Sequence, residues 1–217
     1  MVFATGNSGK LREAQEILGR GFSLVTPAEA GITQEIPETG NTLAANSRQK
    51  AEYIHNQLGT DCFADDTALE VEILGGDPGV HTARYASEGH DPQANMAKLL
   101  REMAQQEMEA SLAREYGIHT VHATRKARFR TVVTLILDGE THVFEGVLEG
   151  RIGLEKKGDG GFGYDPVFIP DSLPAEDGTL VPNTERLTLA QTGETAKNAI
   201  SHRGKALRAM AAFLNGK

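Results

Sequence analysis

Two neighbouring carboxylates stand out among the residues of this 217-residue chain that could carry chemistry. Asp65 and Asp66 follow the apolar stretch Cys62-Phe63-Ala64, which predicts a short buried strand ending at the acids. Functional groups of open α/β sheets gather at such strand ends. Adjacent acids repel each other unless a positive charge is near, and one or two carboxylates with phosphate oxygens and water commonly hold Mg²⁺. Glu38, in a loop bounded by proline and glycine, is a third candidate; the alternative interpretation is a turn in which one Asp is a cap.

The turn Thr5-Gly6-Asn7-Ser8-Gly9-Lys10 joins an apolar stretch to a segment with helical periodicity. Its glycines allow backbone amides to point at an anion, the helix adds its positive end, and Lys10 adds a mobile charge. The standard phosphate loop has four residues between its first glycine and the Gly-Lys pair, followed by Ser or Thr. Here two residues intervene and Leu11 follows. The alternative is an ordinary strand-to-helix turn capped by Asn7 or Ser8.

A glycine-rich segment, residues 158–166, contains four glycines and the aromatic residues Phe162 and Tyr164. Aromatic rings in such a turn suit stacking on a nucleobase, and Asp165 is suited to accept hydrogen bonds or to cap a turn. The alternative is a tight loop between strands, with both rings packed in the core.

Cations gather near the C-terminus, where Ser201 is the predicted cap of the last helix. Lys197, Arg203 and Lys205, together with His202, lie near the positive end of that helix. This arrangement is unfavourable unless an anion or an electron-rich carbonyl is bound there. The alternative is a solvated basic stretch, which we favour for Lys205.

The elements that must position these residues alternate between helix and strand. Apolar periodicity predicts helices over 10–18, over 43–58 between a cap at Asn41 or Thr42 and Gly59, from the cap Asp91 through Met103 or on to Tyr116, and after Ser201. Strands are predicted over 22–25, 62–64, 127–137 and 141–148, the last two forming a hairpin through Asp138-Gly139. This mix predicts an α/β protein with a mixed sheet.

Composition excludes several classes of protein. The net charge of −8 argues against non-specific binding to nucleic acid. No apolar run approaches the roughly 18 residues that span a bilayer, and a secretion signal is not apparent, so we expect a cytoplasmic protein with no membrane partner. Cys62 is expected to pack in the core. His119 and His122 have no supporting ligand set, so a metal site is not expected there.

Five segments in sequence order resemble the inosine triphosphate pyrophosphatases, also called non-standard purine nucleoside triphosphate pyrophosphatases. The segments are Ala4 to Lys10; Glu38-Thr39-Gly40 with Asn46 and Lys50-Ala51; Ala64 to Thr67 with Gly75-Gly76, Pro78-Gly79 and Ala83-Arg84-Tyr85; Gly161 to Pro166; and Lys197 with Ser201 to Gly204. The resemblance spans nearly the whole chain. Departures include Ala45 and Gln191 in place of common acids, Thr67 in place of a common serine, and a stretch at 105–125 that is longer than usual.

The resemblance implies an elongated, two-lobed α/β fold around a mixed β-sheet flanked by helices. The whole of 1–217 would be one domain with the active-site cleft between its lobes, in a homodimer. The implied reaction is Mg²⁺-dependent cleavage of dITP, ITP and XTP between the α and β phosphates, which clears deaminated purines from the nucleotide pool. Two alternatives stay open, a pyrophosphatase for other modified nucleotides and a non-catalytic nucleotide-binding regulator.

Site roles follow from the resemblance residue by residue. Asp66 would be the general base and a metal ligand, with Glu38 as a second ligand. The triphosphate would be held by Thr5, Gly6, Asn7, Ser8, Gly9 and Lys10, and the nucleotide and base pocket would be lined by Thr67, Phe162, Gly163, Tyr164, Asp165, Lys197, His202 and Arg203. Hypoxanthine and xanthine carry an acceptor oxygen at position 6 where adenine carries a donor amine. Cationic donors in the pocket therefore favour hypoxanthine and xanthine over adenine.

Overall fold

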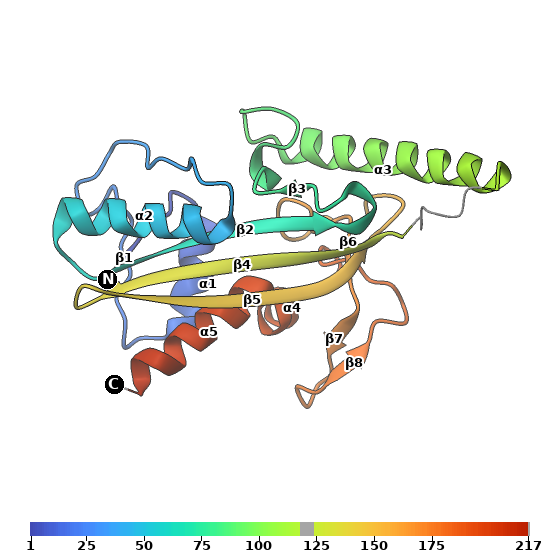
Figure 1. Cartoon of the computed structure of the whole chain (residues 1–217). Coiled ribbons are helices and arrows are strands. Elements are labelled where there is room, and N and C mark those ends of the chain that lie inside the picture. The colour runs from blue at the N-terminus through green and yellow to red at the C-terminus, as the bar shows by residue number, and fades with distance from the viewer. Residues whose placement is uncertain (118–123, 217) are drawn as a thin grey trace. The chain divides into compact units, whose positions relative to one another are not determined.

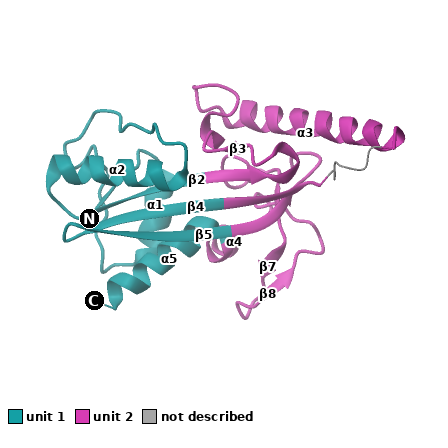
Figure 2. Ribbon diagram, in the orientation of Figure 1, with its two compact units in different colours: residues 1–67, 130–147, 201–217 teal, residues 68–129, 148–200 magenta. Residues whose placement is uncertain are grey.

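The computed structural model describes residues 1–117 and 124–216 (Figure 1). The chain divides into two compact units (Figure 2): unit 1 comprises Met1–Thr67, Arg130–Val147 and Ser201–Lys217, and unit 2 comprises Ala68–Phe129 and Leu148–Ile200. Three strands, β2 (Cys62–Val71), β4 (Lys126–Leu137) and β5 (Glu140–Ile152), supply residues to both units.

The main sheet has six strands in the order β1-β2-β4-β5-β6, with β3 also paired to β2. β1 (Val2–Phe3) runs parallel to β2, whereas β3 (Pro78–Gly79) and β6 (Phe168–Pro170) run antiparallel to their neighbours. The turn between β4 and β5 has Asp138 at φ 52° and Gly139 at φ 80°, the left-handed pair that a two-residue hairpin with a type I′ turn requires. The predicted hairpin and the predicted mixed α/β sheet are confirmed.

In unit 1, helices cover both faces of the sheet (Figure 1). α1 (Ser8–Leu18) and α5 (His202–Asn215) pack on the face where the rings of Phe3 and Phe63 stack at 4.3 Å. α2 (Leu43–Leu58) packs on the other face, against Cys62 and Ala64 of β2. Successive residues of β2 therefore belong to different cores, as the two-residue period of a strand requires.

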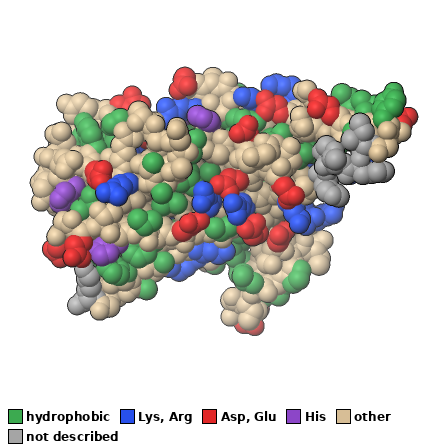
Figure 3. All heavy atoms as spheres, in the orientation of Figure 1, with side chains coloured by type: hydrophobic (Ala, Val, Ile, Leu, Met, Phe, Trp, Pro, Cys, Tyr) green, Lys and Arg blue, Asp and Glu red, His purple; other side chains and the backbone are tan. Residues whose placement is uncertain are grey.

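Unit 2 has a core of its own, in which α3 (Pro92–Glu115) packs with the unit-2 parts of β2, β4 and β5. It also contains a two-stranded sheet of β7 (Ser172–Pro174) and β8 (Leu180–Pro182), the short helix α4 (Glu194–Ile200), and two 3₁₀ turns, Glu72–Leu74 and Thr82–Arg84. No helix in the described ranges is long and apolar enough to cross a bilayer. On the face drawn in Figure 3, basic and acidic side chains are interspersed.

The predicted helix boundaries agree with the structure except at the start of α1, which begins at Ser8 and not at residue 10. Thr42 caps α2 and Gly59 ends it in the left-handed conformation, Asp91 caps α3, which continues to Glu115, and Ser201 caps α5. Cys62 is buried as predicted, and burial raises the pKa of its thiol to about 12. His119, His122 and residues 118–123 of the 105–125 stretch lie outside the described residues.

Two strand predictions were wrong. Segment 22–25 does not form a strand: only Val25 pairs, in an isolated bridge with Val2. Its neighbour β1 is only two residues long and is too short to pair with a four-residue strand. β2 does not end at Ala64 but continues to Val71, since β4 lies beside it in the sheet and Leu69 and Val71 are buried in the core of unit 2. The elements β3, β6, β7, β8 and α4 were not predicted.

Gly146 of β5 allows the close approach of α5 in unit 1. A Cβ there would lie 2.0 Å from the carbonyl oxygen of His202 and 2.7 Å from the amide of Ala206. Gly146→Ala should therefore lower the free energy of unfolding by about 1–3 kcal/mol or more, since backbone cannot move aside as a flexible side chain can. Urea denaturation would measure the change, with Gly21→Ala as control because a Cβ at Gly21 meets nothing within 4 Å. Equal stability of the two variants would contradict this account.

Candidate active site

The two acids Asp65 and Asp66 lie inside β2 and point to opposite faces of the sheet in unit 1. Asp65 contacts Lys10 of α1 and Arg203 of α5, whereas Asp66 contacts Asn46 of α2. The prediction of a carboxylate pair at a strand end was therefore wrong. Because side chains alternate along a strand, two sequential acids do not share one site. β1 pairs with β2 only as far as Phe63, so both acids still follow the end of the parallel pairing.

The carboxylate of Asp66 is contacted by three groups: two hydrogen-bond donors and one ammonium. Its Oδ2 accepts a hydrogen bond from Asn46 Nδ2 at 3.1 Å, its Oδ1 accepts one from the Thr67 amide at 3.0 Å, and Lys50 Nζ lies 3.8 Å from Oδ1. Burial raises the pKa of Asp66, and Lys50 and Asn46 oppose that rise only in part. A carboxylate with a raised pKa is better matched to accept a proton near neutral pH.

Glu38, in the loop before α2, contacts the same lysine as Asp66. Lys50 Nζ lies 2.7 Å from Glu38 Oε1, so one ammonium group bridges Glu38 and Asp66. Burial lowers the pKa of Lys50, but Asp66, Asp65 and Glu38 more than reverse this, and its pKa lies above the ordinary value. Lys50 therefore stays charged.

The Glu38–Lys50–Asp66 group fits one mode of metal binding. Among the residues in the described ranges, no three His, Cys, Asp or Glu side chains are grouped as a metal site. Mg²⁺ does not need such a group, because it is usually bound through one or two carboxylates plus water and substrate phosphates. Glu38 and Asp66 offer two carboxylates that already share one cation.

Asp65 lies in a buried cluster of ion pairs on the other face. Its Oδ1 is 3.0 Å from Lys10 Nζ and its Oδ2 is 3.0 Å from Arg203 Nε, while Arg203 Nη1 lies 2.7 Å from Glu13 Oε2. Burial alone would raise the pKa of Asp65, but Lys10 and Arg203 hold it well below its usual range. Burial in turn lowers the pKa of Lys10.

This cluster explains the cations at the start of α5. The predicted anion at this helix end is supplied by Asp65 and Glu13 of the protein, and Ser201 Oγ also donates to Glu13 Oε1 at 3.1 Å. His202 is buried, with its carbonyl oxygen facing Gly146. Lys205 is exposed, as favoured from the sequence, and donates to the carbonyl of Val147.

The turn before α1 has the form of a capped helix start. Asn7 Oδ1 accepts hydrogen bonds from the amides of Gly9 and Lys10 at 2.9 and 3.2 Å, and Thr5 Oγ1 accepts one from the Asn7 amide at 3.1 Å. The expected special backbone is not observed, because neither Gly6 nor Gly9 has a positive φ. A Cβ on Gly9 would lie 3.1 Å from Asn7 Oδ1, so this glycine makes room for the cap. Gly6 and Ser8 are exposed, and Lys10 is paired rather than mobile.

The glycine-rich turn of unit 2 is organised by Asp165. Its Oδ2 accepts hydrogen bonds from the Phe162 amide at 2.7 Å and from Lys197 Nζ at 2.5 Å. A Cβ on Gly161 would lie 2.1 Å from that carboxylate oxygen, and Gly163 adopts φ 62°, so both positions require glycine. The turn is therefore built around a buried carboxylate, as the sequence suggested for Asp165.

The two aromatic residues of this turn differ in position. Phe162 is 49% exposed, with Lys197 Nζ 4.3 Å from its ring centroid. Tyr164 is buried, and its hydroxyl donates to the carbonyl of Thr82 at 2.9 Å. Phe162 offers a ring for stacking, whereas a role of Tyr164 or Gly163 in binding would have to come from the backbone.

Three residues that were given no site role from the sequence belong to these clusters: Glu13, and Asn46 and Lys50, which were named only as part of a segment that carries the resemblance. Asn46 and Lys50 are four residues apart on one face of α2, so both reach the even-numbered side of β2. Thr67, on the odd-numbered side, shares a hydrogen bond of 2.7 Å with the hydroxyl of Thr131. Glu13 follows Lys10 by one helical turn, which could have indicated its position but not its partner.

Comparison with known proteins gives consistent matches over nearly the whole chain. The model of the Ham1 family matches residues 1–213. A dITP/XTP pyrophosphatase of Porphyromonas gingivalis is 44% identical over 214 residues, which cover 99% of this chain and 96% of the relative. A dITP/XTP pyrophosphatase of Bacillus subtilis is 39% identical over 215 residues, with 98% and 96% covered.

Solved structures agree with these sequence matches. A HAM1 protein from Coxiella burnetii has a TM-score of 0.82 at 30% identity and covers 100% of this chain and 98% of its own. A Mycobacterium abscessus protein described as a nucleoside-triphosphatase / dITP/XTP pyrophosphatase has a TM-score of 0.69 at 33% identity, with 98% and 97% covered.

Replacing Asp65 by Asn should lower the free energy of unfolding at pH 7 by about 3–5 kcal/mol, because Lys10 and Arg203 would lose a buried counter-charge. The pKa of Asp65 in the folded chain lies below the value of about 3.9 expected when unfolded, so its contribution is present above that pH and is lost on acidification. Wild type should therefore lose more stability than Asp65→Asn between about pH 5 and pH 2. Urea denaturation at each pH would measure this.

The matched control is Asp171→Asn, which removes an acid from the exposed pair of Asp171 with Arg151, 3.5 Å apart. That change should lower the free energy of unfolding by no more than about 1 kcal/mol. Equal effects of the two substitutions at pH 7 would contradict the buried-cluster account.

Proposed function

Because the chain belongs to the Ham1 family, we propose that it hydrolyses the non-standard purine nucleoside triphosphates dITP, ITP and XTP to the monophosphate and pyrophosphate. The family resemblance read from the sequence is thereby confirmed. The observation that carries the reaction class is the Glu38–Lys50–Asp66 group, in which a carboxylate with a raised pKa lies beside a second carboxylate and a charged lysine. Such a group supplies a base and charge for an attack on a phosphate.

In the proposed reaction, Asp66 accepts the proton of a water molecule whose oxygen attacks the α-phosphorus. The bond from that phosphorus to the oxygen bridging the α and β phosphates breaks, and pyrophosphate leaves with this oxygen. Asn46 and the Thr67 amide donate hydrogen bonds to the carboxylate of Asp66, and Lys50 lies 3.8 Å from it, where its charge would stabilise negative charge that develops on the phosphate. The turn Thr5 to Lys10 is proposed to hold the phosphates.

Magnesium is proposed as the cofactor, with Glu38 and Asp66 as the residues that would hold it. Bound there, Mg²⁺ would neutralise phosphate charge and polarise the phosphoryl oxygens. The ion pairs around the two acids support this proposal: Lys10, Lys50 and Arg203 are already paired with Glu13, Glu38, Asp65 and Asp66. A triphosphate bound beside cations that are already paired requires a further cation.

Selection of the base is proposed to use donors toward the 6-oxo group of hypoxanthine and xanthine. Arg203 and His202 in unit 1, and Lys197 with the exposed ring of Phe162 in unit 2, are the proposed residues. An adenine amine in place of the oxygen would leave buried donors without a partner, and this penalty gives large discrimination.

We further propose that the protein acts in the cytoplasm as a homodimer and binds neither nucleic acid nor membrane. The net charge of −8 supports the first exclusion.

Purified protein with Mg²⁺ should release pyrophosphate from dITP, ITP and XTP much faster than from ATP, GTP or dUTP. A coupled pyrophosphate assay and a separate orthophosphate assay would measure both products. Orthophosphate as the first product would contradict the cleavage position, preference for dUTP would favour a different modified-nucleotide pyrophosphatase, and binding of ITP without turnover would favour a regulator. Omitting Mg²⁺ in the presence of EDTA should abolish release.

Asp66→Asn should lower kcat by about 10²–10⁴-fold, the range that a general base contributes. The folding of the variant, followed by circular dichroism and urea denaturation, should be intact because the amide keeps the size of the side chain. Asp171→Asn, the same chemical change at an exposed position, should leave kcat unchanged. Activity of Asp66→Asn near that of wild type would remove Asp66 as the base.

A further inference from the structure

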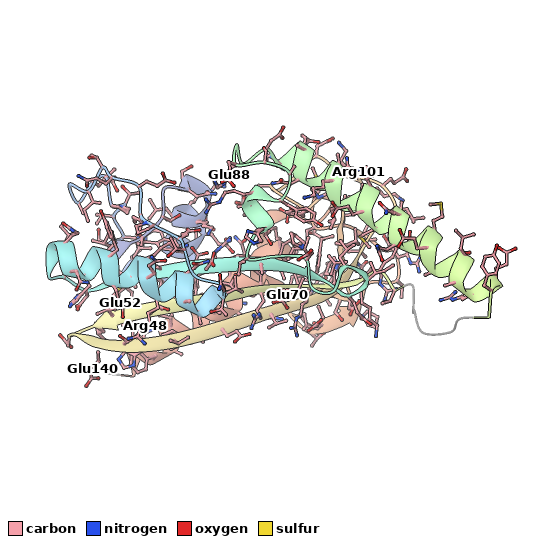
Figure 4. The ribbon with its side chains drawn as sticks, turned by 45° about the horizontal axis from the view of Figure 1, so that its top comes forward. Arg48, Glu52, Glu70, Glu88, Arg101 and Glu140 are labelled. Carbon is pink, nitrogen blue, oxygen red and sulfur yellow. The ribbon has the colours of Figure 1, made fainter. Side chains whose placement is uncertain are left out.

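Helix α2 holds the Glu38 loop through one polar face. Gln49 Oε1 accepts a hydrogen bond from the Thr39 amide at 2.9 Å, and Lys50 pairs with Glu38 at 2.7 Å. Asn46, one turn earlier on this face, contacts the same loop. Arg48 and Glu52 pair with each other at 2.7 Å on an exposed side of the helix (Figure 4).

Asn46 uses both ends of its amide. It is 4% exposed, its Oδ1 accepts a hydrogen bond from the Gly40 amide at 2.7 Å, and its Nδ2 donates to Asp66 Oδ2 at 3.1 Å. The orientation of the amide follows from its partners, because a backbone N–H can only donate and an ionised carboxylate only accepts. Asn46 is therefore a direct link between the loop that carries Glu38 and the proposed base.

The loop approaches Asn46 closely only because residue 40 is glycine. A Cβ on Gly40 would lie 2.7 Å from the Cβ of Ala45 and 2.8 Å from Asn46 Oδ1. The φ of Gly40 is not positive, so the requirement is steric. Loop, helix and strand are thus in contact at one buried amide.

We propose that Asn46 is a positioning residue, which fixes Glu38 relative to Asp66 and fixes the rotation of the Asp66 carboxylate. The inference rests on the proposed function, since both carboxylates act on the substrate there. With Asn46 in place, each oxygen of Asp66 has a hydrogen-bond donor, and Oδ2 loses its donor when Asn46 is removed. Small misplacement of a reacting group costs on the order of 10²-fold in rate. Removal of Asn46 should therefore act on kcat more than on substrate binding.

A purely structural role makes a different prediction, and the chain contains a matched residue for it. Asn95 of α3 is 3% exposed and also bridges two segments, accepting from the Ala86 amide at 2.6 Å and donating to the carbonyl of Ala83 at 2.9 Å. Its amide contacts backbone and no carboxylate. Asn95→Ala therefore measures what loss of a buried bridging asparagine does to stability alone.

The experiment compares Asn46→Ala with Asn95→Ala, and with Arg48→Ala as a surface control on α2. Steady-state kinetics with dITP, urea denaturation and amide hydrogen exchange of segment 38–41 would be measured for each. Asn46→Ala should lower kcat by about 10- to 100-fold, as expected for residues that orient ligands of a reactive site, with KM nearly unchanged. Its Gly40 amide should exchange faster. Asn95→Ala should lose comparable stability while keeping kcat.

Asn46→Asp separates the two hydrogen bonds. The carboxylate can still accept from Gly40, so protection of that amide should be retained. It cannot donate to Asp66 and places a like charge beside it, so kcat should fall at least as far as in Asn46→Ala. Gly40→Ala displaces the loop instead. Because Gly40→Ala and Asn46→Ala remove the same contact, the double variant should lower kcat by less than the product of the two single effects.

Two results would overturn the inference: a kcat of Asn46→Ala no lower than that of Asn95→Ala, or unchanged exchange of the Gly40 amide in Asn46→Ala. A wild-type protein that released no pyrophosphate from dITP or XTP in the same assay would overturn the proposed function, and this inference with it. An active wild type with either of the first two results would overturn the inference alone.

Discussion

The alternation of side chains along β2 is the constraint on which the rest of the site depends. Asp65 and Asp66 are neighbours in sequence, yet the first faces α1 and α5 and the second faces α2. Their environments shift their pKa values in opposite directions, downward for Asp65 through Lys10 and Arg203 and upward for Asp66 through burial. One strand thereby carries an acid that its cationic partners keep ionised near neutral pH and an acid suited to accept protons.

Asp65 links segments that are distant in sequence. Removing charges from water is costly unless every charge is paired, and in this cluster Asp65 and Glu13 face Lys10 and Arg203. The cluster joins the start of α1, the middle of β2 and the start of α5. The same pairing means that Lys10 and Arg203 do not present their full charge to a ligand, and a triphosphate needs help from elsewhere in the site.

On the opposite face of the sheet, α2 also links separate segments, but through fewer charged groups. Asn46 and Lys50 each contact Asp66 and also the loop that carries Glu38. Lys50 attracts both carboxylates by its charge. Asn46 orients its partners, because the planar amide of Asn46 has one donating and one accepting end. The two faces of the sheet therefore differ in kind: one holds a compensated ion cluster and the other holds oriented carboxylates.

The sequence by itself determined the helix caps, the turn of the β4–β5 hairpin and the family. Caps such as Thr42 and Asp91 and the Asp138-Gly139 turn depend on residues a few positions apart, so they were predicted correctly. Tertiary structure decided which face each acid of β2 occupies, because that depends on how far the strand continues and on what packs against it. It also decided that Tyr164 is buried while Phe162 is exposed, and that Arg203 pairs with Asp65, 138 residues away. Partners at such separations are chosen by packing and desolvation, which no local pattern encodes.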